Sequence, residues 1–288
     1  MNSTFYTVTP LYTSSKLKKE QNLNIYYKME CSQPSGSFKI RGMETLCRHH
    51  FARGKRSFVA SSGGNAGYSL AYVGKQLGVK VKVVVPKTTS VLMIAKIKNL
   101  GASVQIVGNV WDEADQYARK VAEETDAVYV SPFDDPLLWK GHASLIDECA
   151  QQMPQPDKII VSVGGGGLLC GIFEGMKRNG WMDTEVITTE TMGAASFYKS
   201  YHAKKRITLD EIKTVAKKSL ELASDFKVHP HVMTDEEAVN ATRIFYEEYN
   251  FTVEAACGAA LSVPFFYPEL ISENEHVLVV VCGGVNPK

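Results

Sequence analysis

The sequence predicts an α/β fold in which parallel strands alternate with helices that cover the faces of the sheet. Short runs rich in β-branched residues alternate with longer stretches of helical character along most of the chain. Two glycine-rich loops, at 61–67 and 164–167, each follow a predicted strand and precede a predicted helix. Ligands of open α/β sheets collect at the carboxyl ends of strands, so these loops mark the expected binding cleft.

The alternation is clearest in the first half of the chain. Pro86 ends one β-branched run, and Gly101 closes one helical stretch. In chain order we expect a strand at 24–29, a helix at 40–50, a strand at 57–61, a helix at 66–77, a strand at 79–85, a helix at 90–100, a strand at 103–107, a helix at 111–124 and a strand at 127–130.

The same rhythm resumes after a proline-bracketed loop at 131–136. Thr234 is placed to cap one of the later helices. We expect a helix at 138–151, a strand at 158–163, a helix at 168–177, a strand at 185–189, helices at 235–249 and 255–265, and a strand at 276–281.

Composition excludes several classes of function. The 288 residues carry a formal net charge of +1, which argues against a nucleic-acid-binding surface. No run approaches the roughly 18 apolar residues of a membrane span, and residues 1–30 hold no apolar signal core. None of the six cysteines forms a CxxC pair, so the expected location is the reducing cytoplasm.

Lys39 is the strongest catalytic candidate. It lies in a Gly/Ser-rich turn between a predicted strand and a predicted helix, where a lysine is ordinarily a solvated surface amine. Here Phe38 offers a flat apolar face beside it, and Gly36 permits close approach of the backbone. An amine near two anion-binding loops suits an imine-bound phosphorylated aldehyde.

For His142, we favour a structural histidine with hydrogen-bond partners over a histidine that contacts the site.

The two glycine loops favour different anions. Four consecutive glycines at 164–167 exceed what a tight turn needs, and their N–H groups with the helix dipole favour a monophosphate. The loop is neither a dinucleotide fingerprint nor a Walker loop. The hydroxyls and the Asn65 amide of the loop at 61–67 suit a small carboxylate, although Ser62 or Asn65 could simply cap the helix.

Several motifs together carry a family resemblance, which runs from about Thr9 to Asn286. Ser-Phe-Lys-Ile-Arg-Gly at 37–42, Ser-Ser-Gly-Gly-Asn-Ala-Gly at 61–67 and Ser-Val-Gly-Gly-Gly-Gly-Leu-Leu at 162–169 resemble the fold-type-II (tryptophan-synthase-β-like) pyridoxal-phosphate enzymes. Pro-Phe-Asp-Asp-Pro at 132–136, Glu-Ala-Ala-Cys-Gly at 254–258 and Val-Cys-Gly-Gly at 281–284 narrow the resemblance to the L-serine/L-threonine dehydratases.

The resemblance implies a role for each matching residue. Lys39 would form the internal aldimine, Phe38 would pack on one face of the pyridine ring, Asn65 would bond the phenolic oxygen, and Cys282 would lie beside the pyridine nitrogen. The phosphate would be held by the backbone N–H groups of Gly164, Gly165, Gly166, Gly167 and Leu168. The substrate loop would comprise Ser62, Gly63, Asn65 and Ala66, and a monovalent-cation site, for K⁺, would include Glu190, Ala194 and Ser196.

Two further expectations concern the reaction. The thiol of Cys282 would leave the ring nitrogen neutral, a weaker electron sink that favours direct loss of hydroxide. Related racemases have a serine base at the position of Gly63, so racemisation should be poor here.

The family usually has a longer, glycine-containing stretch where this chain has residues 218–228, and relatives continue beyond Lys288. The residue on the second ring face is therefore unassigned, with Ala223 only a guess.

The resemblance also implies the domain organisation: two open twisted parallel sheets with flanking helices, a small inserted substrate-loop domain at 36–130, a large cofactor-binding domain at 1–35 and 131–288, and a homodimer. The predicted activity is pyridoxal-phosphate-dependent α,β-elimination of L-serine, and of L-threonine, to a 2-oxo acid and ammonia. The alternatives are another β-elimination or β-replacement on a small amino acid, and a cofactor-binding protein with little turnover.

Overall fold

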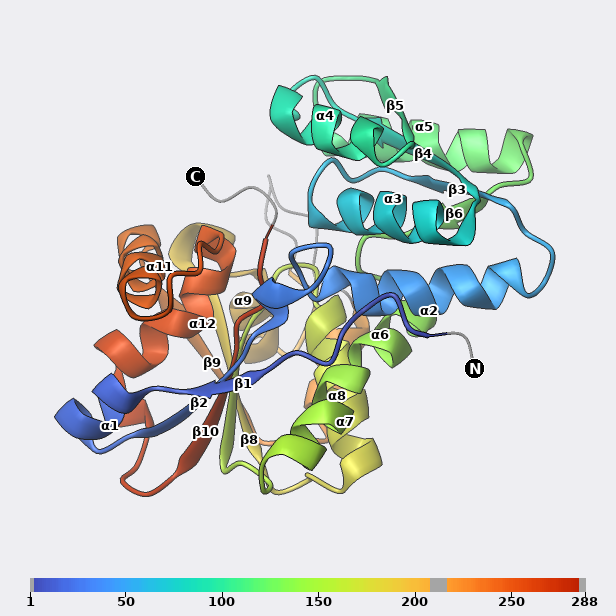
Figure 1. Ribbon diagram of the computed structural model, residues 1–288. Coiled ribbons are helices and arrows are strands. Elements are labelled where there is room, and N and C mark those ends of the chain that lie inside the picture. Colours follow the sequence, from blue (N-terminus) through green and yellow to red (C-terminus); the bar gives the residue numbers. More distant parts are fainter. Residues whose placement is uncertain (1–2, 208–216, 285–288) are drawn as a thin grey trace.

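A computed structural model describes residues 3–207 and 217–284, and it contains two sheets (Figure 1). The larger sheet has the strand order β1-β2-β10-β7-β8-β9. Only the β1–β2 pair is antiparallel. Its strands are β1 (Leu11–Thr13), β2 (Asn24–Lys28), β7 (Lys158–Ser162), β8 (Glu185–Thr191), β9 (Val228–Met233) and β10 (His276–Val280). Fully buried Ile159, Ile160 and Val161 show that β7 is covered on both faces, as a central parallel strand must be.

The smaller sheet is entirely parallel, with the order β5-β4-β3-β6. Its strands are β3 (Ser57–Ala60), β4 (Lys80–Val85), β5 (Ser103–Ile106) and β6 (Val128–Val130). Phe58 and Val83 belong to the apolar cluster that includes α3, whereas Val59 and Val84 pack with α5. The alternation of side chains along each strand therefore buries both faces.

Helices cover both sheets. The small sheet packs with α3 (Asn65–Leu77), α4 (Val91–Asn99) and α5 (Trp111–Glu124). In Figure 1, α11 and α12 lie on one side of the large sheet and α7 and α8 on the other. Around this sheet the helices are α1 (Ser15–Gln21), α2 (Lys39–Phe51), α6 (Pro136–His142), α7 (Ser144–Gln152), α8 (Gly167–Asn179), α9 (Ser196–His202), α10 (Lys217–Ala223), α11 (Asp235–Tyr249) and α12 (Ala255–Phe266). Helix α2 packs against both α3 and α6 and so joins the two sheets.

The predicted α/β class with two parallel-rich sheets is confirmed, and Thr234 forms a capping box with Glu237 at the start of α11. The single helix predicted at 138–151 is wrong, because the chain breaks at Ala143 into α6 and α7. Strands β1 and β9 and helices α1, α9 and α10 were not predicted. Strand β9 contains Pro230, which a sheet tolerates because β9 is an edge strand paired only with β8. No helix among the described residues is long and apolar enough to span a membrane.

Candidate functional site

The carboxyl ends of β7 and β10 and the start of α2 enclose one cavity, which we call the lysine cavity. It contains every residue expected to hold the cofactor: Phe38, Lys39, Asn65, Gly164, Gly165, Gly166, Gly167, Leu168 and Cys282. Phe133, Ser162, Val163, Leu169, Glu254, Ala256 and Gly283 complete its lining. Residues from distant parts of the sequence therefore meet here, at the strand ends where an α/β sheet binds its ligands.

Lys39 is the first residue of α2, and its side chain reaches into the lysine cavity. Its Nζ donates a hydrogen bond to the carbonyl oxygen of Pro132 at 2.6 Å and lies 5.0 Å from the centroid of the Phe38 ring. Loss of hydration lowers the pKa of Lys39 to about 8 from its ordinary 10.5, and nearby Cys282 opposes this shift only in part. The amine is thus prepared to act as a nucleophile and a base near neutral pH.

Phe38 is held by an unusual neighbour, His142. The two rings meet edge to face with their centroids 4.9 Å apart. Among the described residues neither ring nitrogen of buried His142 has a hydrogen-bond partner, so the expected hydrogen-bonded histidine is wrong. Burial, followed by the charges of Lys39 and Arg41, places the pKa of His142 well below 6.5. The imidazole is therefore uncharged and packs edge to face against the ring of Phe38.

The glycine loop after β7 is shaped by its lack of side chains. Gly166 caps α8 with φ of 79°, a left-handed conformation that glycine adopts without strain. A Cβ on Gly165 would collide with the ring of Phe133, whereas a Cβ on Gly164 would meet nothing within 4 Å. Phe133 thus packs on one part of the loop, whereas Gly164 is exposed and has open space where a side chain would begin.

A second cavity adjoins the first, and we call it the loop cavity. Ser62, Gly63, Gly64 and Asn65 line it together with Pro86, Thr89, Ser90, Met93, Trp111 and Glu254. Asn65 and Glu254 line both cavities, and Asn65 Nδ2 donates to Glu254 Oε2 at 2.9 Å. Ala66, expected in the substrate loop, is buried and lines neither cavity.

The base of the substrate loop is anchored by Asp115 of α5. Ser61 Oγ donates to Asp115 Oδ1 at 2.6 Å, and Tyr129 and Arg119 also donate to this carboxylate. Burial alone would raise the pKa of Asp115, but the hydrogen bonds from Ser61, Tyr129 and Arg119 keep it below its usual 3.8. At Gly63 an added Cβ would collide with Thr89, so a serine at this position would require Thr89 to move.

Cys282 lies just after the end of strand β10 and lines the lysine cavity. Its Sγ lies 3.7 Å from Ser162 Oγ. A hydrogen bond with Cys257 lowers the pKa of Cys282, while the same bond and burial raise the pKa of Cys257. The five other cysteines are also free thiols.

The residues expected to bind a cation lie outside both cavities, at the end of β8. Glu190 accepts hydrogen bonds from the backbone N–H groups of Phe197 at 2.9 Å and Tyr198 at 2.7 Å, and from Ser196 Oγ at 3.4 Å. Ala194 lies between them in a short 3₁₀ turn, Met192–Ala194. Burial raises the pKa of Glu190 even though these bonds favour its charged form. The start of α9 therefore already supplies partners for this buried carboxylate.

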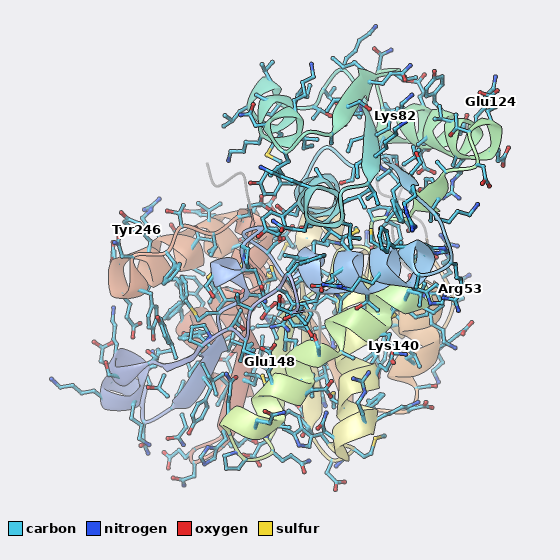
Figure 2. All side chains as sticks on the ribbon, turned by 45° about the vertical axis from the view of Figure 1, so that its right-hand side comes forward. Arg53, Lys82, Glu124, Lys140, Glu148 and Tyr246 are labelled. Atoms are coloured by element: carbon cyan, nitrogen blue, oxygen red, sulfur yellow. The ribbon has the colours of Figure 1, made fainter. Side chains whose placement is uncertain are left out.

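A buried ionic network lies two residues beyond Lys39. Arg41 donates to Glu30 through Nε and Nη2, both at 2.7 Å, and to Glu148 through Nη1 at 2.6 Å and Nη2 at 2.8 Å. Lys28 Nζ adds a bond to Glu148 at 2.7 Å. In Figure 2, Glu148 of α7 lies in the interior of the molecule, below α2. The network ties the start of α2 to β2 and α7.

Sequence reasoning assigned no role to seven of the lining residues, and Phe133 and Glu254 are the aromatic and the acidic one among them. Both lie inside motifs that carry the family resemblance, and this was the only signal for them. The residue considered for the second ring face, Ala223, is instead buried in the large apolar core and does not line the lysine cavity. Phe133 is the aromatic residue that lines the cavity in addition to Phe38.

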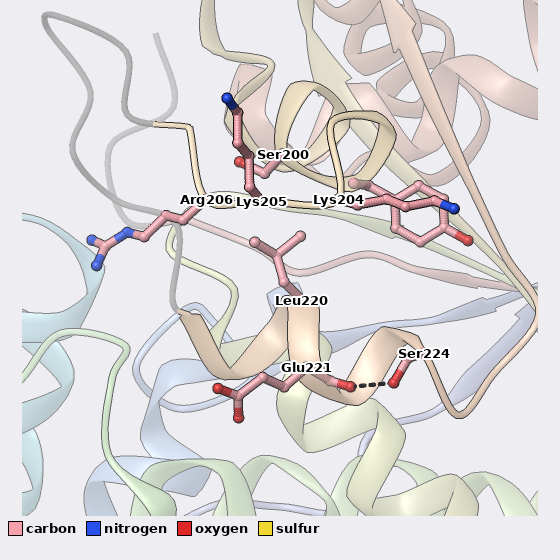
Figure 3. Close-up of a pocket in the computed structure, with 8 residues that line it drawn as sticks. Ser200, Lys204, Lys205, Arg206, Leu220, Glu221 and Ser224 are labelled. Atoms are coloured by element: carbon pink, nitrogen blue, oxygen red, sulfur yellow. Dashed lines mark hydrogen bonds between the residues drawn. The ribbon is translucent and has the colours of Figure 1, made fainter.

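Figure 3 shows a different pocket, between the end of α9 and α10, that holds none of the predicted site residues. It is lined by Ser200, Tyr201, Lys204, Lys205, Arg206, Leu220, Glu221 and Ser224. The lining is mostly apolar carbon with lysine and arginine at its rim, and the residues at 208–216 that follow Arg206 lie outside the described part of the chain. We assign no chemistry to it.

Comparisons with known proteins agree on one family. Residues 3–283 match the family described as "Pyridoxal-phosphate dependent enzyme". The chain is 41% identical to an L-serine dehydratase/L-threonine deaminase of Mus musculus, over 96% of this chain and 91% of the relative. It is 42% identical to an L-serine dehydratase of Dictyostelium discoideum, over 94% of this chain and 85% of the relative.

The fold of this chain is also similar to that of a solved structure. A fungal L-serine ammonia-lyase from Rhizomucor miehei superposes with a TM-score of 0.94 at 34% identity, covering 99% of this chain and 96% of the other. The similarity therefore extends over both sheets and both cavities.

Proposed function

The chain belongs to the pyridoxal-phosphate dependent enzymes, and we propose that it eliminates water from L-serine, and from L-threonine, to yield the 2-oxo acid and ammonia. The observation that carries this proposal is the lysine cavity. It brings together an amine of lowered pKa, the aromatic ring of Phe38, the glycine loop at 164–167 and Asn65 of the substrate loop. The relatives named L-serine dehydratase and L-threonine deaminase support the same reaction.

The residues present fit pyridoxal phosphate. Gly164, Gly165, Gly166 and Gly167 line the lysine cavity without side chains, and they lead into α8, whose N-terminal N–H groups and dipole favour a phosphate. Phe38 offers a ring face, and Lys39 offers an amine that is neutral in a substantial fraction near pH 8. When bound, the cofactor withdraws electrons from the substrate and makes its Cα–H acidic.

The chain's own residues account for binding and proton transfer. Phe38, supported by His142, orients the ring, and the N–H groups at 164–168 hold the phosphate. Lys39 would hold the cofactor through its amine, and once released by the substrate amine its Nζ would be free to remove the Cα proton. The substrate loop binds the substrate carboxylate through Ser62, Asn65 and backbone N–H groups at the start of α3. The β-hydroxyl would then leave with a proton as water. The released enamine would tautomerise to an imine, which water hydrolyses to the 2-oxo acid and ammonia.

Product analysis tests the proposal. The purified protein, saturated with cofactor, should release 2-oxo acid and ammonia in equal amounts from L-serine and L-threonine. Preferential release of sulfide from L-cysteine, or consumption of L-serine without keto acid, would favour the other β-elimination or β-replacement. Cofactor binding without turnover of any of the three substrates would favour a cofactor-binding protein.

We expect Gly164→Ala to weaken cofactor binding without harming the fold. The added methyl group meets no protein atom within 4 Å and needs no positive φ, but it adds bulk to the loop that we expect to hold the phosphate. The dissociation constant of the cofactor should rise about tenfold or more, the value of a lost charge-assisted hydrogen bond. Equilibrium dialysis measures it, and the urea midpoint of the cofactor-free protein should not change. Gly165→Ala is the contrast, because its methyl group collides with Phe133 and should lower the urea midpoint as well.

Attachment of the cofactor to the cofactor-free protein should depend on pH through Lys39. Because burial lowers the pKa of this amine to about 8, its neutral, nucleophilic form predominates above that pH. The attachment rate should therefore rise with pH and level off above about 8, whereas an ordinary lysine would level off only above about 10. Stopped-flow absorbance measures the rate. A rate that still rises tenfold per pH unit above pH 9 would contradict a desolvated amine.

Three finer expectations remain proposals. A K⁺ ion near Glu190, Ala194 and Ser196 is supported by the buried carboxylate at that position. Closure of a small domain at 36–130 onto a large domain at 1–35 and 131–288 is supported by the two separate sheets. A homodimer in the cytoplasm follows from the family resemblance and from six free thiols.

A further inference from the structure

We propose that Glu254 binds the α-ammonium group of the amino-acid substrate, an inference that rests on the proposed function. Glu254 immediately precedes α12 and lines both the lysine cavity and the loop cavity. Among the described residues that line either cavity, it is the only acidic one. It therefore places one carboxylate at the junction between the reactive amine and the substrate loop.

The orientation of this carboxylate is fixed by two neighbours. Asn65 Nδ2 donates to its Oε2 at 2.9 Å, although the two residues are separated by 189 positions in the sequence. The carboxyl group also packs on the backbone of Gly284, where an added Cβ would collide with it.

Charge explains why an acidic residue belongs in this place. The substrate arrives as a zwitterion, and the substrate loop is expected to bind its carboxylate. A second carboxylate nearby would repel that group unless it also met the positive end of the same molecule. The substrate nitrogen arrives as an ammonium, gives up a proton to solvent, and then replaces the lysine nitrogen. It must therefore move from the loop toward Lys39, past Glu254, which lines both cavities.

Two ligands separate ammonium recognition from a purely structural role. L-Alanine carries the ammonium and the carboxylate but has no β-hydroxyl to lose, and propionate carries only the carboxylate. The test compares the two dissociation constants in wild-type holoenzyme and in Glu254→Gln, which keeps an oxygen acceptor for Asn65 and removes the charge. Both holoenzymes are first reduced with borohydride, so that the cofactor stays on Lys39 and bound L-alanine keeps its ammonium. Isothermal titration calorimetry then measures both dissociation constants.

We expect the dissociation constant of L-alanine to rise about tenfold or more in Glu254→Gln, as for a lost hydrogen bond between charged groups. That of propionate should change less than about threefold or should fall, because a repulsive charge has been removed. Glu247→Gln, an exposed glutamate on α11, is the matched control and should leave both constants unchanged.

Equal weakening of both ligands would mean that Glu254 only orders Asn65 and the loop, and it would overturn the inference. Unchanged binding of L-alanine would overturn it as well. Failure of the proposed function looks different: wild-type protein would bind L-alanine with this dependence on Glu254 and yet release no keto acid from L-serine. In that case the elimination is wrong and the ammonium site remains.

Discussion

Lys39→Ala will abolish release of keto acid from L-serine, lowering kcat by about 10⁴-fold or more. A positioned general base alone commonly contributes about 10²–10⁴-fold, and this variant also loses the covalent attachment of the cofactor. The amine lies in a cavity with Phe38 and the glycine loop, and burial already lowers its pKa to about 8, so no solvated lysine can replace it. A coupled dehydrogenase assay for the keto acid measures the loss.

The same variant should lose the visible absorption band of the lysine-bound cofactor. Borohydride reduction and digestion of the wild type should label the peptide that contains Lys39, and the variant should give no such label. Lys140→Ala is the control, because Lys140 is an exposed lysine on α6 (Figure 2) and should leave both the band and kcat unchanged. Keto-acid release within tenfold of the wild-type rate in Lys39→Ala would refute the proposed role of this residue.

Glu148→Gln will lower the free energy of unfolding by about 3–5 kcal/mol, the usual cost of removing one partner from a buried ion pair. The side chains of Arg41 and Lys28 are fully buried, and Glu148 accepts two hydrogen bonds from Arg41 and one from Lys28. Glutamine fills nearly the same volume, so the loss reports charge and hydrogen bonding and not a cavity. Urea unfolding of the cofactor-free protein at neutral pH measures it.

A surface pair provides the control for this prediction. Lys177 and Asp225 form an ion pair of similar length, 2.7 Å, but their side chains are 43% and 50% exposed. Solvent screens this exposed pair, so Asp225→Asn should change the free energy of unfolding far less than Glu148→Gln does. An equally small change for both variants would show that the buried network contributes no more than a surface pair.

The network should also make the protein sensitive to acid. Burial alone would raise the pKa of Glu30, but the charge and hydrogen bonds of Arg41 outweigh it and hold the pKa below 4.5. A carboxyl group whose pKa is depressed by folding stabilises the fold above its unfolded pKa, and this stabilisation is lost as the pH falls through the folded value. The contribution of Glu30 is therefore complete near neutral pH and disappears only in acid below about pH 4.5.

Much of the binding site could be predicted because its parts are local in sequence. Every residue expected to hold the cofactor lines the lysine cavity, since glycine loops at strand ends and a lysine at a helix start are recognisable within a few positions. Phe133 and Glu254 were missed because their motifs indicate the family but give no local sign that these two side chains line a pocket. His142 was misread because its lack of hydrogen-bond partners follows from packing against Phe38.

The alternation of apolar runs and helical stretches determined the parallel α/β class without any structure, because hydrophobic periodicity is a property of neighbouring residues. Local sequence patterns likewise predicted Lys39 and the two glycine loops as parts of a candidate site. Tertiary structure alone decided that β9 pairs at a sheet edge despite Pro230, and that Glu254 meets Asn65 across 189 positions. Those outcomes depend on which distant surfaces pack together, and no local pattern in the chain specifies such contacts.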